Sequence, residues 1–331
     1  MGKDFCATRI LGAMLLLAGC DPGPSGRAAA PSPAAPQAAV KTGRVVIAPQ
    51  FDEAENFSEG LAAVRIGAKF GFIDRQGKIA ITPQFDFAGA FSEGLAAAGI
   101  GAKQGYIDRN GKFVILPRFE VADLYAFSDG LAPVRMGDFL TGKWGYIDKR
   151  GNVVIQPQFD SAGPFADGLA AVGTSEKWTY IDKQGKPAFA PQFDSAGSFA
   201  EGLAAVRVGD FLTGKWGYID KQGTFVIAPQ FDAAFAFSKG LADVRMGDKF
   251  GYIDKKGQVV IDPRFDFADS FSEGLAVVRI GEEGTGKFGF IDEHGKFAID
   301  QQFEQTFAFS EGMAAIRVGD EKNGKYGYIG R

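Results

Sequence analysis

From residue 44 onward the chain alternates short apolar runs with polar turns rich in glycine and aspartate. Runs such as "GLAAVR" and "KWGYID" place apolar residues on both faces of β-favouring stretches, and a "KxVI" run follows an Asp-x-x-Gly turn. Such a tetrapeptide suits a type I turn, because the carboxylate caps local N–H groups and glycine accepts the left-handed conformation. The pattern predicts a three-stranded antiparallel meander.

This pattern recurs eight times as three signatures in fixed order, "PQFD", "FSEGLA" and "GYID", with small changes between copies. Successive "PQFD" signatures are 34, 34, 40, 34, 38, 34 and 38 residues apart, a range typical of solenoids and propellers. The extra residues fall mainly between the Val-Arg and Gly-Tyr pairs, which indicates a variable loop on one face. The signatures begin at Pro49, Pro83, Pro117, Pro157, Pro191, Pro229, Pro263 and Gln301.

Strands with two apolar faces need cover on both sides, so each meander is expected to stack between neighbours. A closed, propeller-like ring and an open β-solenoid both satisfy this requirement. The ring is favoured because an orphan strand at Val45–Ile47 can pair beside Tyr326–Ile329 and remove both exposed edges. The "PQFD" segment then acts as a connector or a short fourth strand. Its phenylalanines are expected to be core residues between units, as at Phe51, Phe85, Phe159 and Phe193.

In most copies an aromatic-glycine pair stands before the "YID" turn. The pair is Trp-Gly at Trp144-Gly145 and Trp216-Gly217. These copies resemble the WG repeat family of bacteria. The resemblance covers about residues 44–331, and it implies a repeat fold with little assigned chemistry. Departures from Trp-Gly occur at Phe70, Gln104, Trp178, Phe250, Phe288 and Tyr326.

The first 19 residues are predicted to be a signal peptide, since two basic residues precede a short apolar run. The run ends in "LAGC", which resembles the lipobox of bacterial lipoproteins and implies lipidation of Cys20. Acyl chains on Cys20 would hold the protein on a membrane, facing the periplasm. Asp21 resembles the signal for retention in the inner membrane of enterobacterial-type lipoproteins. Residues 20–43, rich in proline and alanine, are expected to form a tether to the repeat domain, residues 44–331.

A net charge of −4 and a pI near 5.3 give no electrostatic basis for binding nucleic acid. Cys6 leaves with the signal peptide and lipid occupies Cys20, so neither a disulfide nor thiol chemistry is expected. With His294 as the single histidine, placed in a turn, a His/Cys zinc site is excluded. We expect no cofactor, and no nucleophile has a histidine base.

The carboxylates recur in every copy, which favours turn capping or ion pairing over calcium binding or catalysis. The arginine after the Val of most copies is expected to form an ion pair with a neighbouring repeat, or a rim that holds an anionic ligand. The tryptophans are expected to pack, or to stack on a sugar or cation. The candidate ligand contacts are Trp144, Trp178, Trp216, Arg135 and Arg207.

The sequence therefore predicts a non-enzymatic, lipid-anchored repeat protein that offers a binding or scaffolding surface in the cell envelope. The expected partners are the membrane, through lipid, and an envelope protein or peptidoglycan glycan. Two alternatives remain: an envelope enzyme acting on glycans through a carboxylate pair, and a purely structural spacer.

Overall fold

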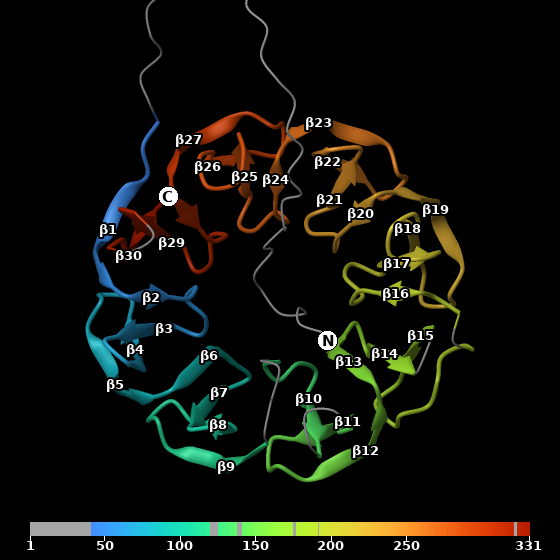
Figure 1. Ribbon diagram of the computed structural model, residues 1–331, viewed down its shortest axis with the longest axis horizontal. Helices are drawn as coiled ribbons and strands as arrows, with labels where there is room; N and C mark the ends of the chain where they lie inside the picture. The colour runs from blue at the N-terminus through green and yellow to red at the C-terminus, as the bar shows by residue number, and fades with distance from the viewer. Residues whose placement is uncertain (1–40, 120–124, 138–140, 175–176, 191, 321–322) are drawn as a thin grey trace, which may run out of the picture.

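Eight small antiparallel sheets close into a ring, and the chain is an eight-bladed β-propeller (Figure 1). The structure is a computed structural model that describes residues 41–119, 125–137, 141–174, 177–190, 192–320 and 323–331. Throughout these residues the secondary structure is β, with no helix. The predicted all-β ring is confirmed, and the open solenoid is wrong.

We number the blades along the chain. Blade 1 contains β2 (Glu53–Ala54), β3 (Leu61–Ile66), β4 (Lys69–Asp74) and β5 (Ile79–Phe85). Blade 2 contains β6 (Phe87–Ser92), β7 (Leu95–Ile100), β8 (Lys103–Ile107) and β9 (Phe113–Phe119). Blade 3 contains β10 (Leu131–Met136), β11 (Lys143–Asp148) and β12 (Val153–Phe159). Blade 4 contains β13 (Ser161–Ala166), β14 (Leu169–Thr174) and β15 (Lys177–Ile181).

The second half of the ring repeats this plan. Blade 5 contains β16 (Ser195–Ala196), β17 (Ala204–Val208), β18 (Lys215–Ile219) and β19 (Phe225–Phe231). Blade 6 contains β20 (Ala233–Ala234), β21 (Leu241–Met246), β22 (Lys249–Asp254) and β23 (Val259–Phe265). Blade 7 contains β24 (Phe267–Ala268), β25 (Ala276–Ile280), β26 (Lys287–Ile291) and β27 (Phe297–Phe303). Blade 8 combines β28 (Gln305–Thr306), β29 (Met313–Val318) and β30 (Lys325–Gly330) with β1 (Arg44–Phe51).

The predicted meander supplies three strands of a complete blade, and the residues after "PQFD" supply a short fourth strand. In blade 1 the order is β2-β3-β4-β5, with every pair antiparallel. Among the described residues, blades 3 and 4 have three strands each. The "PQFD" segment thus ends the last strand of one blade and leads into the first strand of the next.

The two ends of the repeat domain complete one sheet. Val45 pairs with Ile329, Ile47 with Tyr328 and Phe51 with Tyr326. Figure 1 shows the first strand, in blue, beside the last strand, in red. The predicted pairing that closes the ring is therefore confirmed, and it covers the edge of β30.

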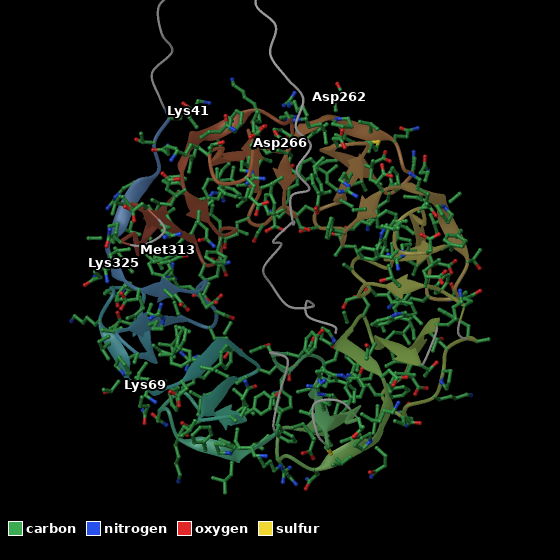
Figure 2. The ribbon with its side chains drawn as sticks, viewed as in Figure 1. Lys41, Lys69, Asp262, Asp266, Met313 and Lys325 are labelled. Carbon is green, nitrogen blue, oxygen red and sulfur yellow. The ribbon has the colours of Figure 1, made fainter. Side chains whose placement is uncertain are left out.

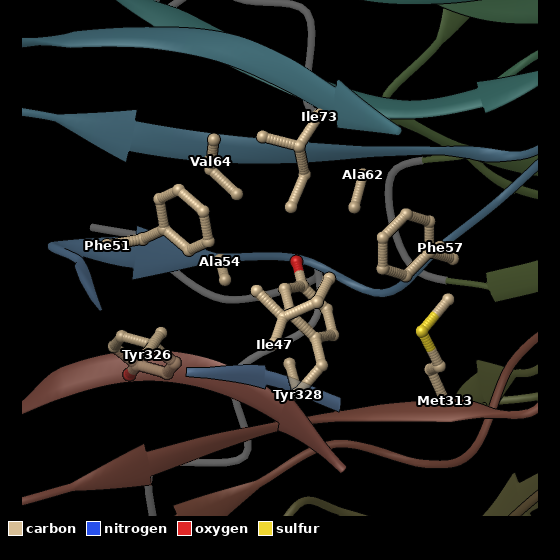
Figure 3. Packing of buried hydrophobic residues seen from close by; sticks show 11 residues of the cluster. Ile47, Phe51, Ala54, Phe57, Ala62, Val64, Ile73, Met313, Tyr326 and Tyr328 are labelled. Atoms are coloured by element: carbon tan, nitrogen blue, oxygen red, sulfur yellow. The ribbon is translucent and has the colours of Figure 1, made fainter. Parts of the chain in front are cut away.

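Among the described residues, the hydrophobic core consists of eight clusters, each formed between two neighbouring blades. At the closure, Ile47 and Tyr328 of blade 8 face Phe57 and Ile73 of blade 1 (Figure 3). An aromatic pair recurs at every blade interface, with ring centroids 4.7–4.9 Å apart. The buried "PQFD" phenylalanines confirm their predicted core role, as for Phe51 and its equivalents Phe85, Phe159 and Phe193.

The glycine of the Trp-Gly pair is required because the last strand of the blade crosses directly over it. A Cβ on Gly145 would lie 2.5 Å from the carbonyl oxygen of Ile155. Blade 4 has Thr179 at this position, and there the Thr179 hydroxyl donates to the carbonyl of Phe189. In the described part of that segment, only isolated bridges replace a last strand. The pair is therefore a packing signature of the blade.

Candidate binding surface

The "FSEGLA" turns point toward the centre of the ring, as Figure 1 shows for the β2–β3 and β24–β25 hairpins. Each turn is bonded to the turn of the next blade. The Glu59 carboxylate accepts from the amide N–H of Gly94, with N–O distances of 3.1 and 3.2 Å, and Ser58 Oγ donates to the carbonyl of Phe91 at 2.6 Å. Arg109, from the "GYID" turn of that next blade, lies 3.6 Å from Glu59. These turns form a continuous inner belt of hydrogen bonds.

At the junction of blades 6 and 7 the two charges of this belt are exchanged. The turn position is acidic in seven copies and is Lys239 in blade 6. The basic position after "GYID" is Arg or Lys in the other copies and is Glu293 in blade 7. At the equivalent positions of other blades, Glu93 pairs with Lys149 at 2.8 Å and Glu201 pairs with Lys255 at 3.0 Å. The exchange preserves the opposite signs.

The "PQFD" acids join blades farther from the centre. Asp194 accepts from Lys177 Nζ of the preceding blade at 2.7 Å and from the amide of Gly209 in its following blade at 2.9 Å. These contacts, the Lys177 hydrogen bond above all, lower the pKa of the Asp194 carboxyl. Figure 2 places two of the equivalent lysines, Lys69 and Lys325, at the outer part of the ring. The structure thus gives these repeated acids the ion-pairing role predicted for them.

The third repeated acid caps its own turn, as the Asp-x-x-Gly pattern predicts. Asp292 Oδ1 accepts from the amide of His294 at 3.0 Å and from that of Lys296 at 2.9 Å, and Gly295 has a positive φ of 77°. His294 is exposed in this turn. Within the described ranges, no group of three or more His, Cys, Asp and Glu residues is arranged to hold a metal ion.

Trp144 and Trp178 are both packed into their blades. Trp144 is 5% exposed, stands edge-on to Tyr125 at 6.0 Å between centroids, and has Arg135 at 5.9 Å from its ring. Trp178 is half-buried, and its indole lies against Gly173, where a Cβ would be 3.2 Å away. Most copies have arginine at the position of Gly173, and the glycine leaves room for the Trp178 indole. Whether either residue contacts a ligand stays a prediction, and the burial of Trp144 leaves little of its ring available.

Trp216 and Arg207 lie side by side on blade 5. Both are half-buried, and they face each other across β17 and β18. The Arg207 guanidinium carbon is 6.0 Å from the Trp216 ring centroid and 5.5 Å from that of Phe211. Its Nε is buried, and no hydrogen-bond partner for it occurs among the residues that the structure describes. Arg207 thus sits between two aromatic rings, one of them at the surface.

Phe211 and Leu212 form the tip of the long loop that joins β17 to β18, and they are 83% and 88% exposed. The loop is held by Asp210, whose carboxylate accepts from the amides of Leu212 and Thr213 and from the Thr213 hydroxyl at 2.6–2.9 Å. These hydrogen bonds, the one from the Thr213 hydroxyl first, lower the pKa of Asp210 to about 2. The sequence pattern predicted a variable loop at this position but not its apolar tip. The Phe-Leu pair between Gly209 and Gly214 is the signal that could have indicated the tip.

Two surface hollows lie beside equivalent loops. One, of about 400 Å³, is at the ring closure and is polar, lined by Asp52, Glu53, Arg65, Arg317 and Lys325 among others. Its charges are largely matched, since Arg65 pairs with Glu53 at 2.7 Å and Lys325 pairs with Asp52. The other, of about 630 Å³, is lined in part by Lys103, Arg118 and Arg135.

Cys20, the predicted lipidation site, lies outside the described residues, as do the predicted signal peptide and almost all of the tether. In the part of the chain that is described, no helix has the length and apolar character needed to cross a membrane. The lipid anchor therefore stays a prediction.

A family model described as "WG containing repeat" matches eight segments of the chain, at residues 41–70, 70–103, 105–138, 144–178, 178–210, 216–250, 250–283 and 288–326. No curated protein matches the sequence.

Several solved structures are similar in fold at low sequence identity. PorZ of Porphyromonas gingivalis, described as an essential bacterial surface component of the type-IX secretion system, is 11% identical with a TM-score of 0.44. The match covers 86% of this chain and 45% of PorZ, so this chain spans less than half of that protein. Hsv2p of Kluyveromyces lactis is 9% identical with a TM-score of 0.44, over 85% of this chain and 97% of the other. A quinonprotein alcohol dehydrogenase-like protein of Bacteroides thetaiotaomicron is 14% identical with a TM-score of 0.45, over 74% and 76%.

Proposed function

Since the chain belongs to the WG-repeat family, we propose that it is a non-enzymatic, lipid-anchored protein whose propeller offers a binding or scaffolding surface in the bacterial cell envelope. Cys20 carries the lipid in this proposal, and residues 20–43 link it to the ring. The ring faces the periplasm, on the inner membrane if Asp21 acts as a retention signal.

This proposal is supported by one observation above all: the repeated polar residues form their hydrogen bonds and ion pairs with other residues of the ring. Acids of the inner belt bind glycine amides of the next blade, and "PQFD" acids bridge lysines and amides of adjacent blades. A residue engaged in holding two blades together is poorly placed to act as a catalytic acid or base. What remains for recognition is the surface of the long loops, which varies from blade to blade.

The binding part of the proposal is tested by co-sedimentation of residues 40–331 with purified peptidoglycan sacculi. We expect the wild-type domain to sediment with the sacculi, and the Trp144→Ala, Trp216→Ala double variant to remain in solution. Because Trp144 is buried, the single variants are compared as well, and a folded Trp216→Ala domain that has lost binding locates the contact. Failure of the wild-type domain to sediment discards the glycan ligand and leaves a protein partner.

The anchor is tested separately by labelling cells with radioactive palmitate. The full chain is expected to incorporate label and fractionate with membranes, whereas Cys20→Ser should do neither. Label retained by Cys20→Ser contradicts the anchor. The enzymatic alternative predicts that substitution of one or two acids abolishes turnover of a glycan while the domain stays folded.

A further inference from the structure

The loop between β17 and β18 has an apolar tip that closure of the loop does not require. Blade 7 has a loop of the same length between β25 and β26, and its tip is Glu283-Gly284 instead of Phe211-Leu212. The two loops close in the same way. Gly214 N donates to Asp210 O at 3.0 Å, and the equivalent bond in blade 7 is 2.7 Å long. The ring therefore accepts a charged tip here, and an apolar tip is not needed to form the loop.

The apolar tip is also held in a set conformation. Asp210 fixes the backbone on both sides of Leu212, and Gly209 at the loop entrance has a positive φ of 99° and donates to Asp194. Hydrogen bonds thus hold the loop backbone in one conformation, while two large apolar side chains face solvent. A preorganised element of this kind binds with a smaller ordering cost.

Arg207 adds a charge to this surface. Its guanidinium lies between Phe211 and Trp216, its buried Nε has no hydrogen-bond partner within the described ranges, and the nearby Asp194 carboxylate attracts its charge. Arg245 and Arg279 likewise have a buried Nε without a partner in the described part of the chain, whereas the equivalent arginines at the ring closure are bonded. Arg65 pairs with Glu53 at 2.7 Å, and Arg317 donates to the carbonyl of Asp320 at 2.6 Å. Arginine and aromatic residues together form the centre of many protein interfaces.

We propose that Phe211, Leu212 and Arg207 form a docking element for a protein partner that has an apolar pocket with a carboxylate at its rim. This inference rests on the proposed binding function and names the kind of partner. The protruding Phe-Leu tip fits a concave apolar site, and the guanidinium supplies the charge that a rim carboxylate complements. The same hexapeptide, "GDFLTG", recurs two blades earlier from Gly137.

Other occupants fit the observations less well. A bilayer with anionic headgroups would face the ionised Asp210 next to the tip and a chain of net charge −4. A second copy would have to offer a hollow with a free carboxylate. The hollow of about 630 Å³ carries Lys103, Arg118 and Arg135, which repel Arg207, and the acids of the other hollow already pair with Arg65 and Lys325. A sugar would stack on Phe211 but has no use for Leu212. A protein pocket accounts for all three side chains.

Site-specific photo-crosslinking in the native bacterium tests this proposal on the full chain. One form carries Phe211→p-benzoylphenylalanine, and the matched control carries Glu283→p-benzoylphenylalanine at the equivalent exposed tip of blade 7. We expect the probe at position 211 to give a discrete protein adduct that the control lacks. Adding Arg207→Ala should reduce the adduct about tenfold, whereas Arg65→Ala should not. Peptide mapping of the adduct should place the crosslink in an apolar pocket next to Asp or Glu.

The proposal is overturned by no adduct at position 211, by an equal adduct at position 283, or by an adduct insensitive to Arg207→Ala. It is also overturned by an adduct with lipid, glycan or a second copy of this chain. The variant Phe211→Glu with Leu212→Gly copies the tip of blade 7 and serves as a folded control. If that variant still sediments with sacculi while position 211 gives no adduct, the docking element fails and the proposed function stands.

Discussion

Ser310 Oγ donates a hydrogen bond of 2.6 Å to the carbonyl oxygen of Phe57, although 253 residues separate them in the sequence. The bond is the same as the one from Ser58 to Phe91 between blades 1 and 2. The junction where the chain ends meet is therefore built like the others. The contact that joins neighbouring repeats therefore also joins the last repeat to the first. The pairing of β1 with β30 completes the eighth sheet.

Removing this hydroxyl should weaken the closure. Ser310→Ala leaves the Phe57 carbonyl without its donor, and we expect a loss of about 1–2 kcal/mol in the free energy of unfolding. Two copies already have alanine at this position, Ala166 and Ala200. Ala200→Ser should therefore gain about 0.5–1 kcal/mol. Urea denaturation followed by circular dichroism measures both, and equal midpoints for all three proteins would contradict the assignment.

The glycine of the Trp-Gly pair should not tolerate a methyl group. A Cβ on Gly145 would lie 2.5 Å from the Ile155 carbonyl oxygen, so Gly145→Ala is expected to cost about 3 kcal/mol as the last strand is pushed away. Gly163→Ala is the control, because its Cβ meets no atom closer than 3.6 Å and should change stability by about 0.5 kcal/mol or less. Thermal melts compare the two variants. Equal effects would sink the explanation.

The exchanged charges at Lys239 and Glu293 should be coupled. Lys239→Glu places two acids at this junction and Glu293→Lys places two bases there, so each single variant is expected to lose about 0.5–1 kcal/mol. The double variant restores the arrangement of the other blades and should recover most of that loss. A double-mutant cycle by chemical denaturation gives the coupling. Additive single effects would show that the two residues do not meet.

Acid should loosen the ring through the bridging aspartates. The hydrogen bond from Lys215 lowers the pKa of Asp232 below its ordinary value of 3.8, and Lys177 and Lys325 act likewise on Asp194 and Asp52. Because the folded pKa is the lower one, the contribution to stability is present above about pH 4 and is lost as the pH falls through the folded pKa. Melting temperatures should be flat from about pH 7 to 5 and then fall. Asp232→Asn should show a smaller fall, and a parallel curve would contradict this assignment.

Excising one repeat should disrupt the ring. Deletion of residues 233–266 removes one unit, and the remaining seven blades cannot all keep the interface geometry of eight. We expect loss of the cooperative thermal transition and a change from the wild-type molar mass in size-exclusion chromatography with light scattering. A variant that melts cooperatively at the wild-type temperature would favour the structural-spacer alternative.

Much of the fold could be predicted because its causes are local. The Asp-x-x-Gly turns, the paired apolar faces and the orphan strand at Val45–Ile47 each depend on a few neighbouring residues, and all are found as expected. The short fourth strand was harder to predict. In blade 1 it is only Glu53–Ala54, too short for a periodic signal.

The site was less predictable, because exposure depends on neighbouring blades. Trp144 and Trp216 have nearly the same sequence around them, yet Trp144 is buried against Tyr125 whereas Trp216 is half-buried beside Arg207. Phe211 is a large apolar residue of the type usually found in a core, yet it is 83% exposed. Repetition alone could not separate a residue that packs from one that faces solvent.

The sequence by itself determined the number of units, three strands of each unit and the partner for the orphan strand, since period and turn chemistry depend on consecutive residues. Only the tertiary structure decided which acid meets which base, why the Trp-Gly glycine is required and which aromatic side chains stay outside the core. Those outcomes arise where two blades or two strands meet. Their contacts join atoms that lie from 10 to more than 200 residues apart.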